Sequence, residues 1–222
     1  MDIFNLIYQL VSGPLVWVAF FVFIGGSIFK VFQMFLLINK KEKYIYTYMS
    51  LKYSLRSIIH WIIPFATVNW RRHPVLTIIT FAFHTCLLIT PTFLLAHAVL
   101  WKKAWNVRWW TLPESLADVM TLMVIIGCVL FLIRRLTIKE VRYLSSASDY
   151  VLLAIVATPF LTGFLAYHQV SNYRVMIILH IVSGIIMLMT IPFTRLIHML
   201  FSVFTRAYMG SEFGNVRHAK DW

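Results

Sequence analysis

Four histidines lie inside long apolar stretches of this sequence, and they are the residues best suited to do chemistry there. They are His84, His97, His180 and His198. An ionisable side chain is costly to place in hydrocarbon, so a histidine at that depth indicates a functional role. One such histidine is often a packing residue, but four that fall as two on each of two segments suggest ligands. Two neutral imidazoles that bind one iron from opposite sides are the axial ligands of a b-type haem, so the sequence predicts two bis-histidine sites.

The segments that must position these histidines are long enough to cross a membrane. Of 222 residues, 60% are hydrophobic and 13% are charged, whereas a soluble domain is about a quarter charged. A membrane-spanning helix needs about 20 apolar residues. Five stretches meet that length, at about 12–37, 74–100, 115–133, 149–167 and 173–204. Because backbone polar groups must pair internally in lipid, we expect an all-α integral membrane protein, 1–222, with five transmembrane helices in a single domain.

The distribution of basic residues predicts the orientation of these helices. Fourteen lysines and arginines fall in the connections after the first and third stretches and in the tail, and only four fall in the opposite connections. By the positive-inside rule, the N-terminus lies outside and the C-terminus lies in the cytoplasm. The net charge of +12 is carried by short clusters between apolar runs, which is typical of a membrane protein and not of a nucleic-acid-binding one.

The segment 44–69 mixes apolar and basic residues and is too polar to span a membrane. We expect it to lie along the cytoplasmic face as an interfacial helix. It would serve either as simple membrane adhesion or as a platform for a cytoplasmic partner.

Depth in the membrane pairs the four histidines. His84 and His97 lie 10 and 23 residues beyond Pro74, while His198 and His180 lie 7 and 25 residues before Thr205. At about 1.5 Å per residue, the members of each pair differ in depth by only about 3–5 Å. We therefore expect His84 to face His198 near the cytoplasmic side and His97 to face His180 near the outer side.

Helical phase supports this pairing on one segment and opposes it on the other. His180 and His198 are 18 residues apart, which is about five whole turns. His84 and His97 are 13 residues apart, which leaves them about 140° apart on an ideal helix. Pro91 lies between them, and a kink there would re-aim one end. The rival pair His73 and His84 has the better angle, but His73 would lie at the water boundary.

Two sequence motifs resemble a known family. The segment LHIVSGIIMLMTIPFTRLIHML (179–200) strongly resembles the haem-binding last helix of the nitrate reductase gamma subunit family, with its H-x17-H spacing and P-F-[ST]-R-L-I-H end. The segment FHTCLLITPTFLLAHAVLW (83–101) is similar to the second helix of related cytochrome b subunits in sulfate-reducer transmembrane redox complexes. Nitrate reductase gamma subunits space their second-helix ligands more closely than 13 residues, so the resemblance favours the sulfate-reducer branch.

This resemblance implies a respiratory role. It implies electron transfer across a bacterial or archaeal cytoplasmic membrane through two b-type haems, and exchange with a menaquinone-type quinone. It also implies a cytoplasmic, heterodisulfide-reductase-like iron–sulfur subunit, a periplasmic multihaem cytochrome c and other membrane subunits as partners. The chain itself would carry electrons as one subunit of an oxidoreductase complex.

Three further residues could serve these sites. Arg195 lies three residues before His198 on the same helix face, where it would pair with a haem propionate or anchor the helix at the interface. Gly184 lies one turn from His180, where it would leave room for a flat macrocycle or for a close helix–helix contact. His168, at the outer end of the fourth span, would bond a quinone or simply lie at the interface. No residue is assigned to a quinone site.

Two other functions remain open from the sequence. A haem-free anchor or quinone-binding subunit would use the histidines only for packing. A metal-ion transporter would use them as ligands, but transporters usually show repeats and carboxylates within the membrane. Asp118 and Asp149 instead lie near the ends of spans.

Overall fold

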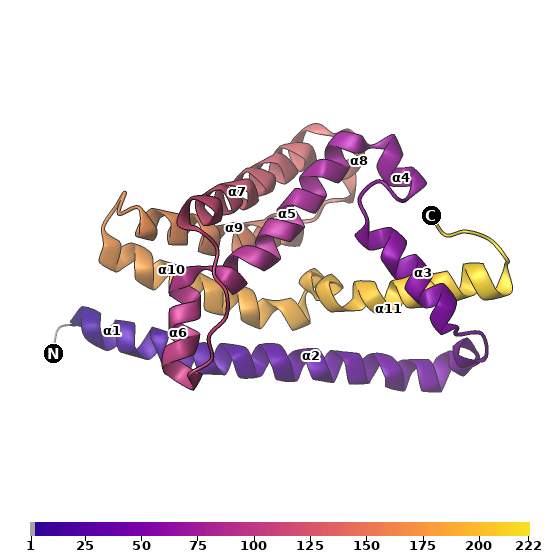
Figure 1. Ribbon diagram of the computed structural model, residues 1–222, viewed down its shortest axis with the longest axis horizontal. Helices are drawn as coiled ribbons and strands as arrows, with labels where there is room; N and C mark the ends of the chain where they lie inside the picture. Colours follow the sequence, from indigo (N-terminus) through magenta and orange to yellow (C-terminus); the bar gives the residue numbers. More distant parts are fainter. Residues whose placement is uncertain (1–2) are drawn as a thin grey trace. The chain divides into compact units, whose positions relative to one another are not determined.

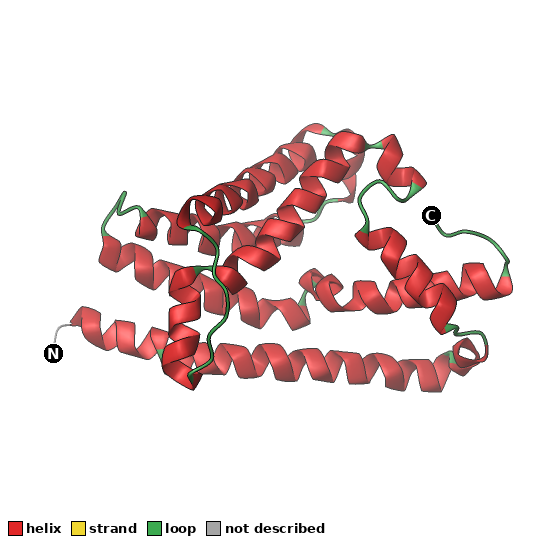
Figure 2. Ribbon diagram, in the orientation of Figure 1, coloured by secondary structure: helices red, strands yellow, loops and turns green. Residues whose placement is uncertain are grey.

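The protein is a multi-pass, all-helical membrane protein. The computed structural model describes residues 3–222, and no strand occurs among them (Figure 2). Five helical stretches in that range are long and apolar enough to cross a membrane: Ile3–Lys41, Pro74–Phe93, Glu114–Thr137, Ala147–Tyr167 and Tyr173–Phe193. The all-α, five-span prediction is confirmed, while the orientation of the termini stays a prediction.

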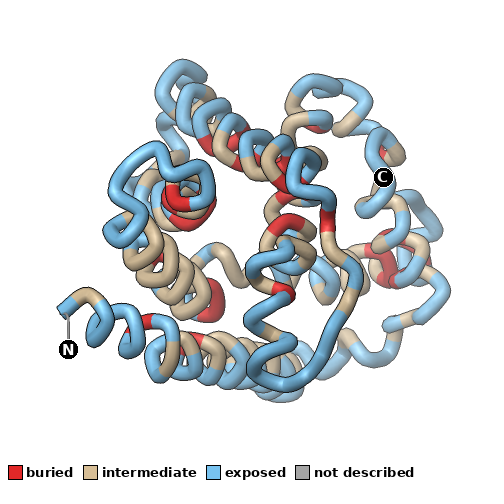
Figure 3. Tube along the Cα trace, turned by 60° about the vertical axis from the view of Figure 1, so that its left-hand side comes forward, coloured by how far each residue is buried: buried red, intermediate tan, exposed pale blue. Residues whose placement is uncertain are grey.

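Large apolar side chains cover the outside of these stretches. Phe21, Ile28 and Val75 are 73%, 65% and 69% exposed, which a water-facing surface would tolerate poorly over so large an area. Buried residues form only short patches along the helices (Figure 3). A helix that is apolar all round and exposed is what contact with lipid requires.

The chain forms two compact units. The first unit comprises the residues through Pro14 together with Ile79–Met187, and the second comprises Leu15–Ile78 together with Leu188–Trp222. The first unit contains all or most of α1 (Ile3–Ser12), α5 (Pro74–Phe93), α6 (Leu95–Trp105), α7 (Glu114–Thr137), α8 (Lys139–Leu144), α9 (Ala147–Tyr167) and α10 (Tyr173–Thr190).

Small residues set the packing of the first unit. Helices α7 and α9 run side by side (Figure 1). Gly127 of α7 lets the ring of Phe83 on α5 lie against the helix backbone, since an added Cβ would sit 2.7 Å from a ring carbon. Val124, one turn earlier, is completely buried. Close approach at small residues is the usual way in which helices associate in a membrane.

The second span is broken where a kink was expected. The sequence predicted one helix over 74–100, but α5 ends at Phe93 and α6 begins at Leu95, with Leu94 in an extended conformation (φ −67°, ψ 132°). The axis turns sharply between the two helices (Figure 1). Pro91 lacks an amide hydrogen and its ring crowds the preceding turn, which accounts for a break within one turn of it. The sequence indicated that a kink at Pro91 would re-aim one end of this span, and the structure ends the helix two residues after that proline.

Three consecutive carbonyl groups at this break find partners outside the helix. A helix end leaves carbonyls unsatisfied, and in lipid each must accept a bond from the protein. Pro91 O accepts a hydrogen bond from His97 Nδ1 (2.7 Å), Thr92 O accepts one from Trp109 Nε1 (3.0 Å), and Phe93 O accepts one from the Leu112 amide (2.9 Å). These three hydrogen bonds therefore stabilise the break.

The last predicted span is also interrupted. The sequence predicted one helix over 173–204, but α10 is followed by two short 3-10 turns, η2 (Ile191–Phe193) and η3 (Arg195–Ile197), before α11 (His198–Ser211) begins. Thr194 between the turns is extended (φ −126°, ψ −174°), and its hydroxyl accepts a hydrogen bond from the Leu196 amide. Pro192 cannot donate to the helix ladder, which explains the interruption. The five-turn phase relation between His180 and His198 assumed a continuous helix, and that assumption is wrong.

The second unit contains the segment predicted to be interfacial. Besides η2, η3 and α11, it holds α2 (Pro14–Lys41), η1 (Lys43–Thr47), α3 (Leu51–Ile62), α4 (Val68–Arg72) and η4 (Glu212–Val216). Helix α3 crosses α11 (Figure 1). The Ser54 hydroxyl donates to Ala207 O (3.0 Å) and lies 3.0 Å from the Ser211 hydroxyl, while Gly210 allows the close approach. Thus 44–69 is helical over much of its length, and its place on the cytoplasmic face stays a prediction.

The last residues of the chain fold back on α3. The Trp222 ring stacks on His60 with centres 3.9 Å apart, and the Arg56 guanidinium lies over Trp222 at 4.5 Å. Asp221 is bonded by the Ser57 hydroxyl and lies 4.0 Å from the Arg206 guanidinium, with its side chain only 2% exposed. The tail is therefore a packed part of the second unit.

Candidate functional site

Two of the four candidate histidines face each other in the first unit. His97 lies in the first turn of α6, after the break at Leu94, and His180 lies in α10. Their rings are nearly parallel, with an angle of 17° between planes, and their centres are 5.9 Å apart. The sequence predicted that these two residues pair, and the structure brings them together.

Both rings are held in one orientation by backbone carbonyls. Nδ1 of His97 lies 2.7 Å from Pro91 O, and Nδ1 of His180 lies 2.8 Å from Pro159 O. A carbonyl oxygen can only accept, so each Nδ1 must carry the proton and donate it. Each Nε2 then keeps its lone pair, which is the state a histidine needs to bind a metal.

The spacing of the two rings suits a shared metal ion. With metal–nitrogen bonds of about 2.0 Å, two imidazoles on opposite sides of one ion have ring centres about 6 Å apart. The observed 5.9 Å is close to this value. Within residues 3–222 no group of three or more His, Cys, Asp and Glu side chains is arranged to hold an ion. The nitrogen donors that the structure brings together here are those of His97 and His180.

Gly163 of α9 lets His180 lie against that helix. A Cβ added at Gly163 would sit 2.8 Å from Nδ1 and 2.9 Å from Cε1 of His180. Pro159, the acceptor for His180, lies one turn earlier on the same helix. Sequence reasoning missed both residues, because nothing in the spacing of α9 relates it to a histidine on α10. The sequence feature that could have indicated this contact is a glycine and a proline one turn apart in an apolar helix.

Gly184 lies in α10 one turn after His180, as predicted from the sequence. A Cβ added there would meet no atom within 4 Å. The backbone is therefore open at Gly184, one turn from His180. The alternative that Gly184 serves a close helix–helix contact within this chain has no support, because no neighbouring atom approaches it.

The other two histidines lie in different units. Nδ1 of His84, on α5 in the first unit, lies 2.8 Å from Thr80 O. His198 begins α11 in the second unit, is exposed, and has its Nδ1 2.8 Å from Arg195 O. Both rings therefore also donate from Nδ1 and keep Nε2 as an acceptor. Their pairing, and a role for the exposed Arg195 side chain, stay predictions.

An acid–base pair lies at one end of α7 and α9. Nε2 of His168, which follows α9, is 3.2 Å from Oδ1 of Asp118 on α7, and both side chains are about one-third exposed. The Phe164 ring lies 4.4 Å from the His168 ring, centre to centre. The sequence singled out His168 alone, since the pairing depends on how α7 packs against α9.

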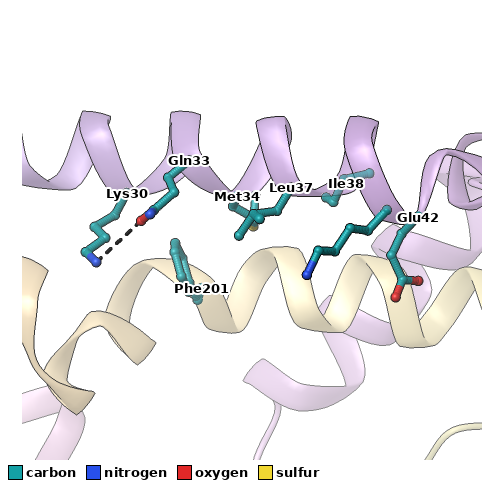
Figure 4. A pocket seen from close by; sticks show the side chains of 8 residues that line it. Lys30, Gln33, Met34, Leu37, Ile38, Glu42 and Phe201 are labelled. Carbon is teal, nitrogen blue, oxygen red and sulfur yellow. Dashed lines mark hydrogen bonds between the residues drawn. The ribbon is translucent and has the colours of Figure 1, made fainter.

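A shallow groove lies in the second unit. It has a volume of about 420 Å³, and Figure 4 shows the α2 side chains and the Phe201 ring that line it. The Lys30 ammonium donates to the Gln33 side-chain oxygen at its edge (3.4 Å). The floor is apolar, made by Met34, Leu37 and Ile38. Polar side chains complete the lining, namely Lys30, Gln33, Lys41 and Glu42.

A comparison with known proteins identifies a relative. The chain is 32% identical over 210 residues to a protein of Nitratidesulfovibrio vulgaris (strain Hildenborough), and the match covers 93% of each chain. The chain belongs to the family of that protein. The match covers nearly the whole chain, so it includes residues of both compact units. No family model matches the chain, and no solved structure matches it.

Proposed function

We propose that this protein is the membrane cytochrome b subunit of a respiratory redox complex and that it binds two b-type haems through histidine pairs. The observation that carries the proposal is the facing pair of His97 and His180, with ring centres 5.9 Å apart and each Nδ1 held by a carbonyl. Haem, when bound, supplies one-electron chemistry. The residues of this chain bind and orient it and exclude water.

His97 and His180 would be the axial ligands of the outer haem. Bonds from Nδ1 to Pro91 O and Pro159 O fix both rings and make Nε2 more basic, as second-shell bonds do at metal sites. Gly184 would give the macrocycle room, because the space beside it is open.

His84 and His198 would be the ligands of the inner haem. Each ring donates from Nδ1 to a carbonyl of its own segment, at 2.8 Å. Arg195 would place a positive charge near a propionate of that haem. The support here is the shared tautomer and the sequence motif that contains Arg195 and His198.

The position in the membrane follows from charge and from the resemblance. With basic connections in the cytoplasm, the N-terminus lies outside and the C-terminus inside a bacterial or archaeal cytoplasmic membrane. Electrons would pass between a quinone pool or a periplasmic multihaem cytochrome c and a cytoplasmic, heterodisulfide-reductase-like iron–sulfur subunit. Other membrane subunits would complete the complex, and the quinone would be of the menaquinone type.

Haem quantitation tests the proposal. The protein, purified in mild detergent, should give dithionite-reduced minus oxidised spectra of b-type haem and two haems per chain by the pyridine haemochrome method. Variants His97→Ala and His180→Ala should each keep one haem. His73→Ala is the matched control, because His73 is exposed and not a proposed ligand, and it should keep two. A folded protein without haem would overturn the proposal and leave a haem-free anchor or quinone-binding subunit.

A further inference from the structure

The Asp118–His168 pair has the arrangement of an oriented base. Oδ1 of Asp118 lies 3.2 Å from Nε2 of His168. A carboxylate at Nε2 fixes the proton on that nitrogen and leaves Nδ1 with a lone pair, which is the relation of base and orienting acid in hydrolytic triads. In the part of the chain that the structure describes, Nδ1 of His168 has no hydrogen-bond partner. It can therefore take a proton from a bound molecule.

A second carboxylate and a tyrosine hydroxyl lie near the pair. Asp118 and Glu114 both belong to α7, and the hydroxyl of Tyr167, the residue before His168, is bonded to Glu114. Because His168 is about one-third exposed, water can carry the proton away afterwards.

The pair lies close to the proposed outer haem ligands. His168 follows Gly163 by five residues, which is about 7.5 Å along a helix, and Gly163 lies directly against the His180 ring. The Phe164 and Tyr167 rings flank His168, with centres 4.4 and 5.1 Å from its own. About one and a half turns of helix therefore separate His168 and its two aromatic neighbours from the contact with His180, the proposed ligand of a one-electron centre.

We propose that Asp118 and His168 form the deprotonating group of a binding site for a hydroquinone carried in the bilayer. A hydroquinone is apolar enough to enter from lipid, stacks on aromatic rings, and gives up a proton with each electron. The proposal rests on the proposed function, because the electrons need the acceptor that His97 and His180 would hold.

The reaction balances over two identical half-steps. In each, one O–H bond of the hydroquinone breaks, its proton goes to Nδ1 of His168, and one electron leaves for the one-electron acceptor that His97 and His180 would hold. His168 passes the proton to water between the half-steps, and the electron moves on to the next acceptor. After both, the ring is a quinone, and two protons and two electrons have left it.

The test compares His168→Gln and Asp118→Asn with the wild type and with the control His73→Gln. All four proteins are loaded with haem and checked by pyridine haemochrome quantitation and by dithionite reduction. Binding of 2-methyl-1,4-naphthoquinone is followed by fluorescence quenching. The rate of haem reduction by 2-methyl-1,4-naphthohydroquinone is then measured by stopped flow across pH.

The His168→Gln variant should bind the quinone within a few-fold of the wild type and keep both haems. Its reduction by the hydroquinone should be slower by about 100-fold or more, the usual effect of losing a general base. The wild-type rate should rise with pH, because a general base must be unprotonated to accept the proton, and the variant should lack that rise. Asp118→Asn should also slow the reduction, and the control His73→Gln should keep the wild-type rate.

Two results would overturn the inference and leave the proposed function intact. One is a haem-loaded wild type that dithionite reduces but the hydroquinone does not. The other is a His168→Gln variant with the wild-type rate and pH profile. Absence of haem from the folded wild-type protein would instead overturn the proposed function itself.

Discussion

Replacing Gly163 by alanine should selectively damage the proposed outer haem site. The added Cβ would sit 2.8 Å from Nδ1 of His180, whereas unstrained contacts between such atoms are about 3.5 Å. The ring must therefore move away from α9 by about 0.7 Å. Because the Pro159 carbonyl lies on the same helix, the bond of 2.8 Å from Nδ1 would lengthen beyond the usual limit of about 3.2 Å and be lost.

The size of the effect follows from these two changes. Crowding of a packed site costs about 1–3 kcal/mol, and the lost hydrogen bond costs about 0.5–1.5 kcal/mol. Loss of the bond that orients a metal ligand lowers metal affinity by about 10–100-fold. Glycine to alanine in a helix is otherwise favourable by about 1 kcal/mol, so a loss of haem would not reflect a weaker helix.

The assay is haem per chain after purification, together with the midpoint potential of each remaining haem. Gly163→Ala should lose one haem or shift one potential while the other is unchanged, and retention of the second haem shows that the protein is folded. Gly25→Ala is the control, because Gly25 is also a helical glycine and a Cβ there meets no atom within 4 Å. Two haems with wild-type potentials in Gly163→Ala would refute the reasoning.

Three further predictions follow from other contacts. Trp109→Phe removes the donor to Thr92 O (3.0 Å), so it should lower thermal stability by about 1–3 kcal/mol in detergent melts, and an unchanged melt would show that the break does not need this bond. Gly184→Leu should fill the open space at this position, one turn from His180, and lower haem content to one per chain by haemochrome assay. Asp221→Asn leaves the partly buried Arg206 without its counter-ion and should increase proteolysis of the C-terminal tail, whereas an unchanged cleavage rate would mean that the ion pair contributes little.

Hydropathy was sufficient to predict the five spans but not where they break. A window of about 20 apolar residues identifies a span because lipid leaves the backbone no other partner. The same criterion cannot see the extended residues Leu94 and Thr194, since both lie within apolar sequence. Proline marks a place where a helix can end, but whether it ends depends on donors such as Trp109, which is 17 residues away from its acceptor.

The candidate site, too, could be predicted only in part from the sequence. Depth in the membrane predicted that His97 and His180 pair, because rise per residue is nearly constant along a helix. The groups that orient them could not be predicted, because Pro159 and Gly163 lie on another helix and no spacing in the sequence relates them to His180. For Asp118 and His168 the reason is similar, since each lies at a helix end and only the packing of α7 against α9 brings them together.

The four histidines differ in where the carbonyl groups that orient their rings lie. His84 and His198 donate to carbonyls three or four residues away, so their own segments orient them. His97 donates across the helix break to Pro91, and His180 donates to Pro159 on a neighbouring helix. The pair of His97 and His180 therefore depends on tertiary structure, and a change in α9 or at the break must alter it. As the proposed haem ligands, they would keep their separation while an electron arrives or leaves, which would lower the reorganisation that each transfer requires. That rigidity is what an electron carrier needs and what a packing residue does not.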